Sequence, residues 1–201
     1  MVTTNPNTNT SAFSSRSLAY VALFAALIAA LGLVPKIDLA FGVPITMQSL
    51  GAMLAGCLLG PRRALMALGL FLLGVAMGLP LLSGGRGGPG VFMGPTVGFL
   101  FGWMLGAGVT GLVMRSLMRR LGASAGWPVL AAAFAASAVG GIVVVYAVGI
   151  AGLCLIAHMT PLQGLLSMAV FVPGDLIKCA VCAAVVQTVV RGLPGWRLDR
   201  D

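Results

Sequence analysis

Two opposite charges, Asp175 and Lys178, lie at the start of an apolar segment near the C-terminus. Pro173 is suited to the first turn of a helix. Asp175 then lies near the positive end of the helix dipole, and Lys178, three residues later, shares its face. The pattern predicts one of two roles. The two charges form the polar part of a small-molecule binding site, or they form an ion pair that neutralises both charges and binds no ligand.

The composition indicates a protein that crosses a membrane several times. Of 201 residues, 59% are hydrophobic and only 8% are charged, and the mean hydropathy is +1.06. A soluble domain of this size could not bury so much apolar surface. Inside a bilayer, ionisable residues are costly and usually functional, which favours the binding-site interpretation of the pair. The lipid bilayer is therefore one expected partner, and the net charge of +8 is not taken to indicate nucleic acid.

The hydrophobic pattern predicts an all-α integral membrane protein with six transmembrane helices. An ordered outer glycine-rich loop and a short extra helix before the last span complete this prediction. A single membrane domain covers residues 17–191. A disordered cytoplasmic tail precedes it at 1–16 and a cytoplasmic C-terminal tail follows at 192–201. The expected helices are 17–34, 47–59, 64–79, 96–118, 129–157 and 173–190, with the short helix inside 158–172.

The basic residues predict the orientation, because loops that stay in the cytoplasm are rich in lysine and arginine. Three cations fall towards one side of the predicted bundle: Lys36, Arg86 and Lys178. We therefore expect both termini to lie in the cytoplasm. Nine cations fall on that cytoplasmic side: Arg16, Arg62, Arg63, Arg115, Arg119, Arg120, Arg191, Arg197 and Arg200.

Further candidate binding groups gather on the predicted outer side. Thr46 and Gln48 could offer a hydroxyl and an amide to a ligand, although Thr46 could equally cap a helix. Tyr146 could donate into a cavity or bind backbone instead. Residues 80–95, which include Arg86 and Gly87, are rich in glycine but also carry apolar side chains. This favours an ordered lid over a cavity rather than a solvent-exposed linker.

Nothing in the sequence predicts an enzyme. The chain lacks the phosphate-binding motif G-x-x-x-x-G-K-[ST] and any recognisable Ser/His/Asp set. The cysteines, Cys57, Cys154, Cys179 and Cys182, lie in or beside apolar segments and are expected to be small buried residues. With His158 as the only histidine, neither a metal site nor a cofactor is expected.

Three segments in order resemble the BioY family, the biotin-specific substrate-binding (S) components of energy-coupling-factor (ECF) transporters. The segments are 43–48 (Val-Pro-Ile-Thr-Met-Gln), the run 78–96 with Gly84-Gly85-Arg86-Gly87-Gly88, and 173–178 (Pro-Gly-Asp-Leu-Ile-Lys). The resemblance implies a protein of the bacterial cytoplasmic (inner) membrane that captures biotin with high affinity at the extracytoplasmic side. It also implies a partner module made of a transmembrane coupling protein (T component) and two cytoplasmic ATPase subunits.

The resemblance also suggests roles for particular residues. Asp175 would accept a hydrogen bond from a ureido N–H of biotin, and either Lys178 or Arg86 would take the carboxylate. An alanine-rich face of the first helix matches the region where S components dock their coupling protein, although small residues four apart also occur where a helix packs within its own bundle. That face comprises Ala22, Ala25, Ala26, Ala29 and Ala30.

Two other functions remain open on the sequence alone. One is a self-sufficient carrier of a small carboxylate or vitamin that needs no ATPase partners. The other is a membrane scaffold without transport activity, which the predicted outer polar cluster disfavours.

Overall fold

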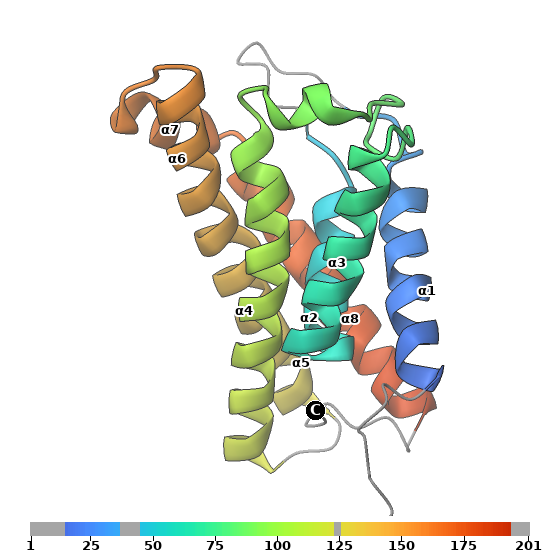
Figure 1. Ribbon diagram of the computed structural model, residues 1–201. Coiled ribbons are helices and arrows are strands. Elements are labelled where there is room, and N and C mark those ends of the chain that lie inside the picture. The colour runs from blue at the N-terminus through green and yellow to red at the C-terminus, as the bar shows by residue number, and fades with distance from the viewer. Residues whose placement is uncertain (1–14, 37–44, 123–125, 194–201) are drawn as a thin grey trace, which may run out of the picture.

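The computed structural model describes residues 15–36, 45–122 and 126–193, and within them the protein is a bundle of helices (Figure 1). Most of the two predicted tails lie outside the described residues. So does the segment 37–44, which contains the first two residues of the 43–48 family motif. The all-α fold predicted from the hydrophobic pattern is confirmed.

Eight α-helices, a short 3-10 helix and a π-helical segment make up the described bundle. The predicted helices are close to the observed ones, with ends that differ by a few residues. The α-helices are α1 (Ser15–Leu31), α2 (Gln48–Leu59), α3 (Pro61–Ala76), α4 (Val97–Leu121), α5 (Trp127–Ala138), α6 (Val145–Ile156), α7 (Pro161–Met168) and α8 (Val172–Gly192). The 3-10 helix η1 is Pro89–Phe92 and the π segment η2 is Val139–Val144.

The start of α3 differs from the prediction, because the helix begins at Pro61 rather than near residue 64. Gly60, with φ of 80°, ends α2 and reverses the chain in a backbone conformation that suits glycine. Pro61 then occupies the first turn of α3, where its missing N–H leaves no hydrogen bond unmade. Arg62 and Arg63 therefore belong to the helix rather than to a loop before it.

The predicted fifth span is one helical rod, residues 127–156, but its middle is a π segment that the sequence analysis did not predict. The extra residue in a π turn changes the direction of the side chains that follow it. Gly140 lies here against Thr110 of α4, so closely that a Cβ atom would clash with the threonine hydroxyl. The π segment thus begins where the rod meets α4 most tightly, and it ends just before Tyr146.

Glycines of α4, which are spaced four residues apart, pack directly on α6. A Cβ atom on Gly98 would lie 2.6 Å from the Val148 carbonyl oxygen, and one on Gly102 would lie 3.1 Å from the Val145 carbonyl oxygen. Gly152 faces Gly98 across the same crossing. This contact fixes α6 against α4, and therefore fixes one wall of any site between them.

The glycine-rich segment between α3 and α4 contains a tight reversal. The backbone N–H of Leu82 donates to the Arg86 carbonyl and the N–H of Arg86 donates back, at 3.0 and 3.2 Å. Gly84 and Gly85, both with φ near +70 to +80°, form the turn between them. The N–H of Gly88 then binds the Val75 carbonyl of α3 at 2.8 Å. These bonds place Arg86 above the bundle end.

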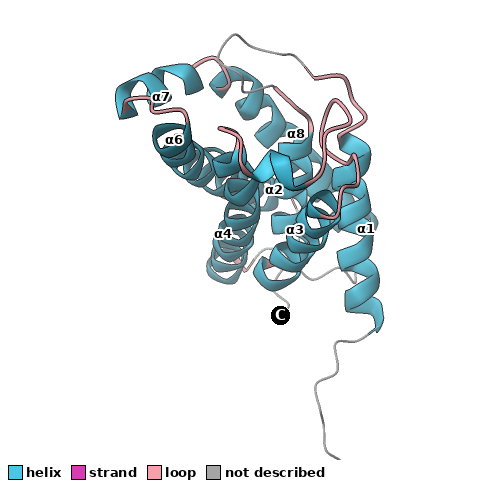
Figure 2. Ribbon diagram, turned by 45° about the horizontal axis from the view of Figure 1, so that its top comes forward, coloured by secondary structure: helices cyan, strands magenta, loops and turns pink. Residues whose placement is uncertain are grey.

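The short helix α7 begins with a capping box, which agrees with the predicted extra helix before the last span. The Thr160 hydroxyl accepts from the Gln163 backbone N–H at 3.3 Å, and the Gln163 side chain accepts from the Thr160 N–H at 2.8 Å. Figure 2 shows α7 at the same end of the bundle as the glycine-rich loop.

Among the residues that the structure describes, three helical segments are long and apolar enough to cross a membrane: 97–121, 127–156 and 172–192. The helices α1 and α2 are apolar but shorter. The number of six spans therefore stays a prediction. The described arginines at the start of α1, the start of α3 and the ends of α4 and α8 lie at one end of the bundle, with the described chain ends (Figure 1). Arg86 and Lys178 lie towards the other end.

Candidate ligand-binding site

A cavity lies at the end of the bundle where α2, α4 and α8 begin. Its wall also includes the Leu82–Arg86 turn, the start of α6 and the junction between α7 and α8. The lining residues are Ile45, Thr46, Gln48, Ser49, Leu82, Arg86, Thr96, Phe99, Leu100, Trp103, Gly141, Val145, Tyr146, Met168, Phe171, Asp175 and Lys178. A mostly apolar wall with a few polar groups is typical of a small-molecule site.

Six of the seven predicted ligand-binding residues line this one cavity: Thr46, Gln48, Arg86, Tyr146, Asp175 and Lys178. The seventh, Gly87, does not line it. Gly87 instead packs against the backbone of Leu79, where a Cβ atom would clash with the carbonyl oxygen. Nor does the Thr46 side chain cap α2, whose N-cap residue is Met47 without a side-chain hydrogen bond. Thr46 is therefore placed at the cavity rather than used as a cap.

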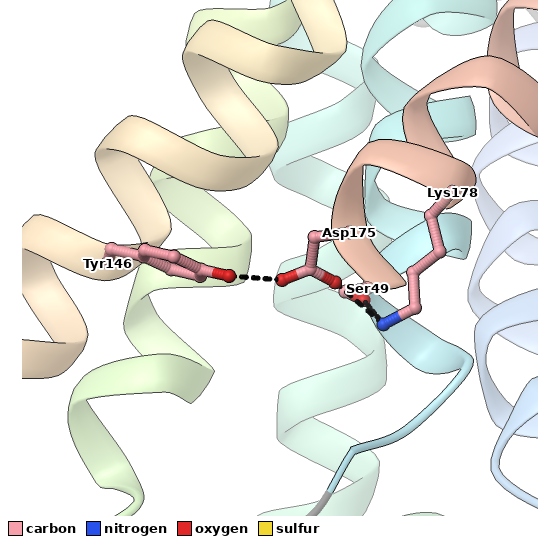
Figure 3. Close-up of polar contacts among 4 residues, drawn as sticks. All are labelled: Ser49, Tyr146, Asp175 and Lys178. Carbon is pink, nitrogen blue, oxygen red and sulfur yellow. Dashed lines mark hydrogen bonds and ion pairs between the residues drawn. The ribbon is translucent and has the colours of Figure 1, made fainter. Parts of the chain in front are cut away.

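The charged pair of α8 forms the centre of a chain of hydrogen bonds that crosses three helices (Figure 3). Lys178 Nζ donates to Asp175 Oδ1 at 2.8 Å, and Tyr146 of α6 donates its hydroxyl to Asp175 Oδ2 at 2.7 Å. Lys178 Nζ also donates to Ser49 Oγ of α2 at 3.0 Å. Asp175 and Lys178 are each only 7% exposed. The lysine and the tyrosine therefore compensate the buried carboxylate from two sides.

Arg86 differs from Lys178 in its partners. Asp175 is the only carboxylate side chain in the part of the chain that the structure describes, and it forms an ion pair with Lys178. Arg86 is half-buried, and its Nε donates to the Ser83 carbonyl at a long 3.4 Å. The cavity thus contains one cation that Asp175 neutralises and a second cation, a guanidinium, that no described carboxylate compensates.

Gln48 lines the cavity, but its amide already binds three backbone groups. Its Nε2 donates to the carbonyls of Ile28 at 3.1 Å and Leu81 at 3.0 Å, and its Oε1 accepts from the Ser83 N–H at 3.0 Å. The side chain is completely buried. Gln48 therefore joins α1, α2 and the start of the glycine-rich turn, which is a structural role as well as a place in the wall.

Neither Ser49 nor the aromatic wall was predicted from the sequence. Ser49 follows Gln48 directly, but its partner Lys178 is 129 residues away, so no local pattern points to it. Phe99 and Trp103 lie four residues apart on one face of α4 and Phe171 precedes α8. This spacing was a signal that could have found the first two, although the same spacing is common in any helix core.

Comparison with known proteins places this arrangement in a family. The model of the BioY family matches residues 5–195. The biotin transporter BioY of Rhodobacter capsulatus is 47% identical over 194 residues, which cover 92% of this chain and 98% of that protein. The chain belongs to the BioY family. The biotin transporter BioY of Rhizobium etli is also 47% identical, over 182 residues that cover 90% of this chain and 96% of the relative.

A solved structure extends the similarity of this BioY family member to three dimensions. The crystal structure of the S-component for biotin from an ECF-type ABC transporter matches with a TM-score of 0.80 and 32% sequence identity. The match covers 88% of this chain and 91% of that chain. The family and its S-component fold are therefore as the three sequence motifs predicted, and the relatives are membrane transporters rather than enzymes.

In this BioY family member, the alanine-rich face of α1 divides into two sides. Ala25 is 8% exposed and packs in the core, and Ala29 is partly buried against it. The other three alanines, which are spaced four residues apart, are exposed: Ala22, Ala26 and Ala30. Only this second side is accessible to another helix.

The cysteines lie mainly in the core below the cavity. Cys57 of α2 and Cys182 of α8 both contact the hydroxyl of Ser137 of α5, at 3.6 and 3.3 Å between sulfur and oxygen. Cys179 is buried and Cys154 partly buried. Within residues 15–36, 45–122 and 126–193, no group of three or more His, Cys, Asp or Glu residues lies close enough to hold a metal.

Proposed function

We propose that this protein takes part in biotin uptake as the high-affinity biotin-binding membrane component of an ECF-type ABC transporter. The observation that carries the proposal is the cavity itself. It combines a buried carboxylate–ammonium pair, a separate guanidinium and an aromatic wall within a fold that matches the biotin S-component at a TM-score of 0.80. Each feature suits one part of biotin. The ion pair suits the ureido ring, the aromatic wall suits the sulfur-containing ring, and the guanidinium suits the carboxylate on the flexible chain.

The ureido ring fits the polar end of the cavity. Asp175 uses one lone pair on each oxygen for Lys178 and Tyr146, and a carboxylate has about four acceptor sites in all. The remaining sites can accept a ureido N–H. Lys178 has three N–H donors, of which two bind Asp175 and Ser49, so the third can donate to the ureido carbonyl. Thr46 offers a further hydroxyl at the same wall.

The carboxylate of biotin belongs with Arg86. Lys178 is already neutralised by Asp175, so a second carboxylate would find little net charge there. Arg86 has no described carboxylate partner, and a guanidinium binds a carboxylate through two parallel hydrogen bonds. Between the two ends, Phe99 and Trp103 supply an apolar wall for the sulfur-containing ring.

Biotin uptake would require partners that the proposal takes from the ECF system. These are a transmembrane coupling protein and two cytoplasmic ATPase subunits. The exposed alanines of α1 support a helix–helix contact within the membrane, because small residues allow backbones to approach closely. The separation of cations between the two bundle ends supports an orientation with both termini in the cytoplasm and the cavity outside. The bacterial relatives support a location in a bacterial cytoplasmic membrane.

The decisive experiment is purification in mild detergent followed by mass spectrometry of any retained small molecule. We expect biotin, and after its removal we expect calorimetric titration to show tight one-to-one binding of biotin. Absence of biotin binding by correctly folded protein would overturn the proposal.

A second preparation separates the ATP-driven function from the alternative, a carrier that works alone. The gene is expressed with and without candidate coupling protein and ATPases, and uptake of labelled biotin is measured. We expect the ATPases to co-purify with the protein and uptake to depend on ATP hydrolysis. Full uptake with the binding protein alone would favour the self-sufficient carrier.

A further inference from the structure

The hydrogen-bond chain across the cavity contains two hydroxyls at its ends, Tyr146 on α6 and Ser49 on α2, that touch the charged pair and not each other (Figure 3). We infer that Tyr146 and Ser49 are positioning residues, which fix the direction of Asp175 and Lys178 so that both present their remaining hydrogen-bonding sites to a ureido ring. This inference rests on the proposed function and specifies how its polar end works.

The charged pair cannot fix its own direction. Asp175 and Lys178 lie three residues apart on one helix, so they can meet in several side-chain conformations. The lysine side chain is long and flexible, and holding it in one conformation costs entropy. Contacts from other helices are therefore needed to select one arrangement of the pair within the cavity.

Tyr146 and Ser49 provide those contacts from the two sides of α8. The tyrosine hydroxyl binds the carboxylate oxygen that Lys178 leaves unused, which fixes the plane of the carboxylate. The serine oxygen accepts a second hydrogen bond from the ammonium group, which fixes the position of Lys178 Nζ. Each contact comes from a different helix, so the positions of α2, α6 and α8 together determine where the pair points.

The backbone before Tyr146 supports this role. Tyr146 is the second residue of α6, and α6 directly follows the π segment Val139–Val144, whose extra residue sets the direction of the side chains after it. The α6 backbone in turn is held by close contact with the glycines of α4. The tyrosine hydroxyl is thus carried by a rigid element, as preorganised binding requires.

The alternative roles are a direct contact with the carboxylate or the sulfur-containing ring of the ligand and a purely structural contact. A series of three ligands separates them: biotin, desthiobiotin, which keeps the ureido ring and carboxylate but lacks sulfur, and biotin amide, which lacks the carboxylate charge. A residue that acts through Asp175 and Lys178 must affect all three ligands equally, because all three keep the ureido ring.

The variants are Tyr146→Phe and Ser49→Ala, measured by calorimetric titration with each ligand and by thermal unfolding of the unliganded protein. We expect the Kd of every ligand to rise about tenfold, which is typical for loss of one hydrogen bond to a charged group. Ser49→Thr keeps a hydroxyl and should restore affinity. Tyr20→Phe on α1 and Ser137→Ala, whose hydroxyl lies on α5 outside the cavity lining, are matched controls expected to leave each Kd within about twofold, well below a tenfold change.

Each outcome decides the inference. Unchanged affinities in both variants would overturn it and leave biotin binding by the wild type intact. A loss limited to biotin and desthiobiotin would indicate contact with the carboxylate instead, and a loss that spares desthiobiotin would indicate contact with the sulfur-containing ring. Lower thermal stability with unchanged affinities would assign the hydroxyls to folding alone. If the wild type itself binds none of the three ligands, the proposed function fails rather than the positioning role.

Discussion

Gln48 on α2 accepts a hydrogen bond from the backbone N–H of Ser83 at 3.0 Å, and this contact ties the glycine-rich turn to the bundle. The same amide donates to the carbonyls of Ile28 and Leu81, so one side chain joins three separate segments. The turn carries Arg86 at its end. The position of the guanidinium at the cavity therefore depends on an amide whose own hydrogen bonds go to backbone.

Gln48→Met tests this dependence, because it keeps the side-chain length and removes the amide. We expect a clear loss of thermal stability, since each buried backbone group left unpaired costs roughly 1–3 kcal/mol. Biotin affinity should fall as well, because Arg86 loses its support. Thermal unfolding and calorimetric titration measure the two effects. Normal stability combined with lost binding would instead mean that the Gln48 amide binds the ligand directly.

Arg86→Met should weaken biotin binding while leaving the fold intact, because the side chain is half-buried and has no described carboxylate partner. Loss of a charge-assisted contact with the ligand carboxylate predicts a rise in Kd of roughly 10- to 100-fold. Biotin amide, which lacks that charge, should bind the variant and the wild type almost equally. Arg86→Lys should recover only part of the affinity, since an ammonium cannot form two parallel hydrogen bonds.

The opposite pattern would exchange the roles of the two cations. If Arg86→Met weakens the binding of biotin and of biotin amide to the same extent, the guanidinium does not bind the carboxylate of biotin. Lys178 would then be the remaining cation for that group.

Asp175→Asn removes the negative charge at the other end of the cavity but keeps the shape of the side chain. The variant leaves Lys178 buried without its anion, which costs on the order of 3–5 kcal/mol of folding stability. Biotin binding should also fall, and by more than in Thr46→Ala, because Asp175 carries the charge that strengthens a bond from a ureido N–H. Melting curves and titrations of both variants give the two quantities.

The double variant Asp175→Asn with Lys178→Met removes the unpaired charge and serves as the control. We expect its stability to return towards that of the wild type while its biotin affinity stays low. Near-native affinity in the double variant would show that the pair is only structural.

Features of the site that depend on neighbouring residues in the sequence could be predicted, whereas features that depend on contacts between distant segments could not. Asp175 and Lys178 could be assigned to one helical face because Pro173 and a three-residue spacing fix their geometry within a single turn. Ser49 could not be found, because its role depends on a contact with a residue 129 positions away. Gln48 was correctly placed at the cavity, yet its three backbone partners come from tertiary packing and are invisible in the sequence.

The helices show the same division. The four-residue spacing of the α4 glycines is a local signal of close helix packing, because a glycine without a Cβ atom lets another backbone approach. The π segment was missed because Gly140 and Gly141 are also compatible with an ordinary helix. What distinguishes this site is the close contact between Gly140 and Thr110 of α4, which is tertiary packing and is not visible in the local sequence. The family motifs in turn identified the fold without determining the number of spans.

Membrane orientation can be tested in the glycine-rich segment. Gly87 is a poor site for a labelling cysteine, because a Cβ atom there would clash with the Leu79 backbone. Gly90 is exposed and has open space where a Cβ would lie. In a background without the four native cysteines, Gly90→Cys should react with a membrane-impermeant thiol reagent added to intact cells. Reaction only after the cytoplasmic side is opened would reverse the proposed orientation.

The two sides of α1 make opposite predictions for substitution by leucine. Ala26 is exposed between Ala22 and Ala30, so Ala26→Leu should leave folding and biotin binding unchanged. It should weaken co-purification with the coupling protein and ATPases, because a larger side chain would separate two closely packed helices. Ala25 lies in the core at 8% exposure. Ala25→Leu should therefore lower stability by about 1–3 kcal/mol through overpacking.

Ala184→Leu is the matched control, because Ala184 is an exposed alanine on a different helix, α8. The three variants are co-expressed with the partner subunits, and subunit recovery, thermal stability and biotin binding are measured for each. Reduced recovery in Ala26→Leu alone, with normal biotin binding, assigns the exposed alanines to docking. Equal loss of recovery in Ala184→Leu would show that any added bulk at the lipid-facing surface disturbs assembly. Normal recovery in Ala26→Leu would place the coupling protein on another face, since a docking helix in close contact with Ala26 could not accept the larger side chain.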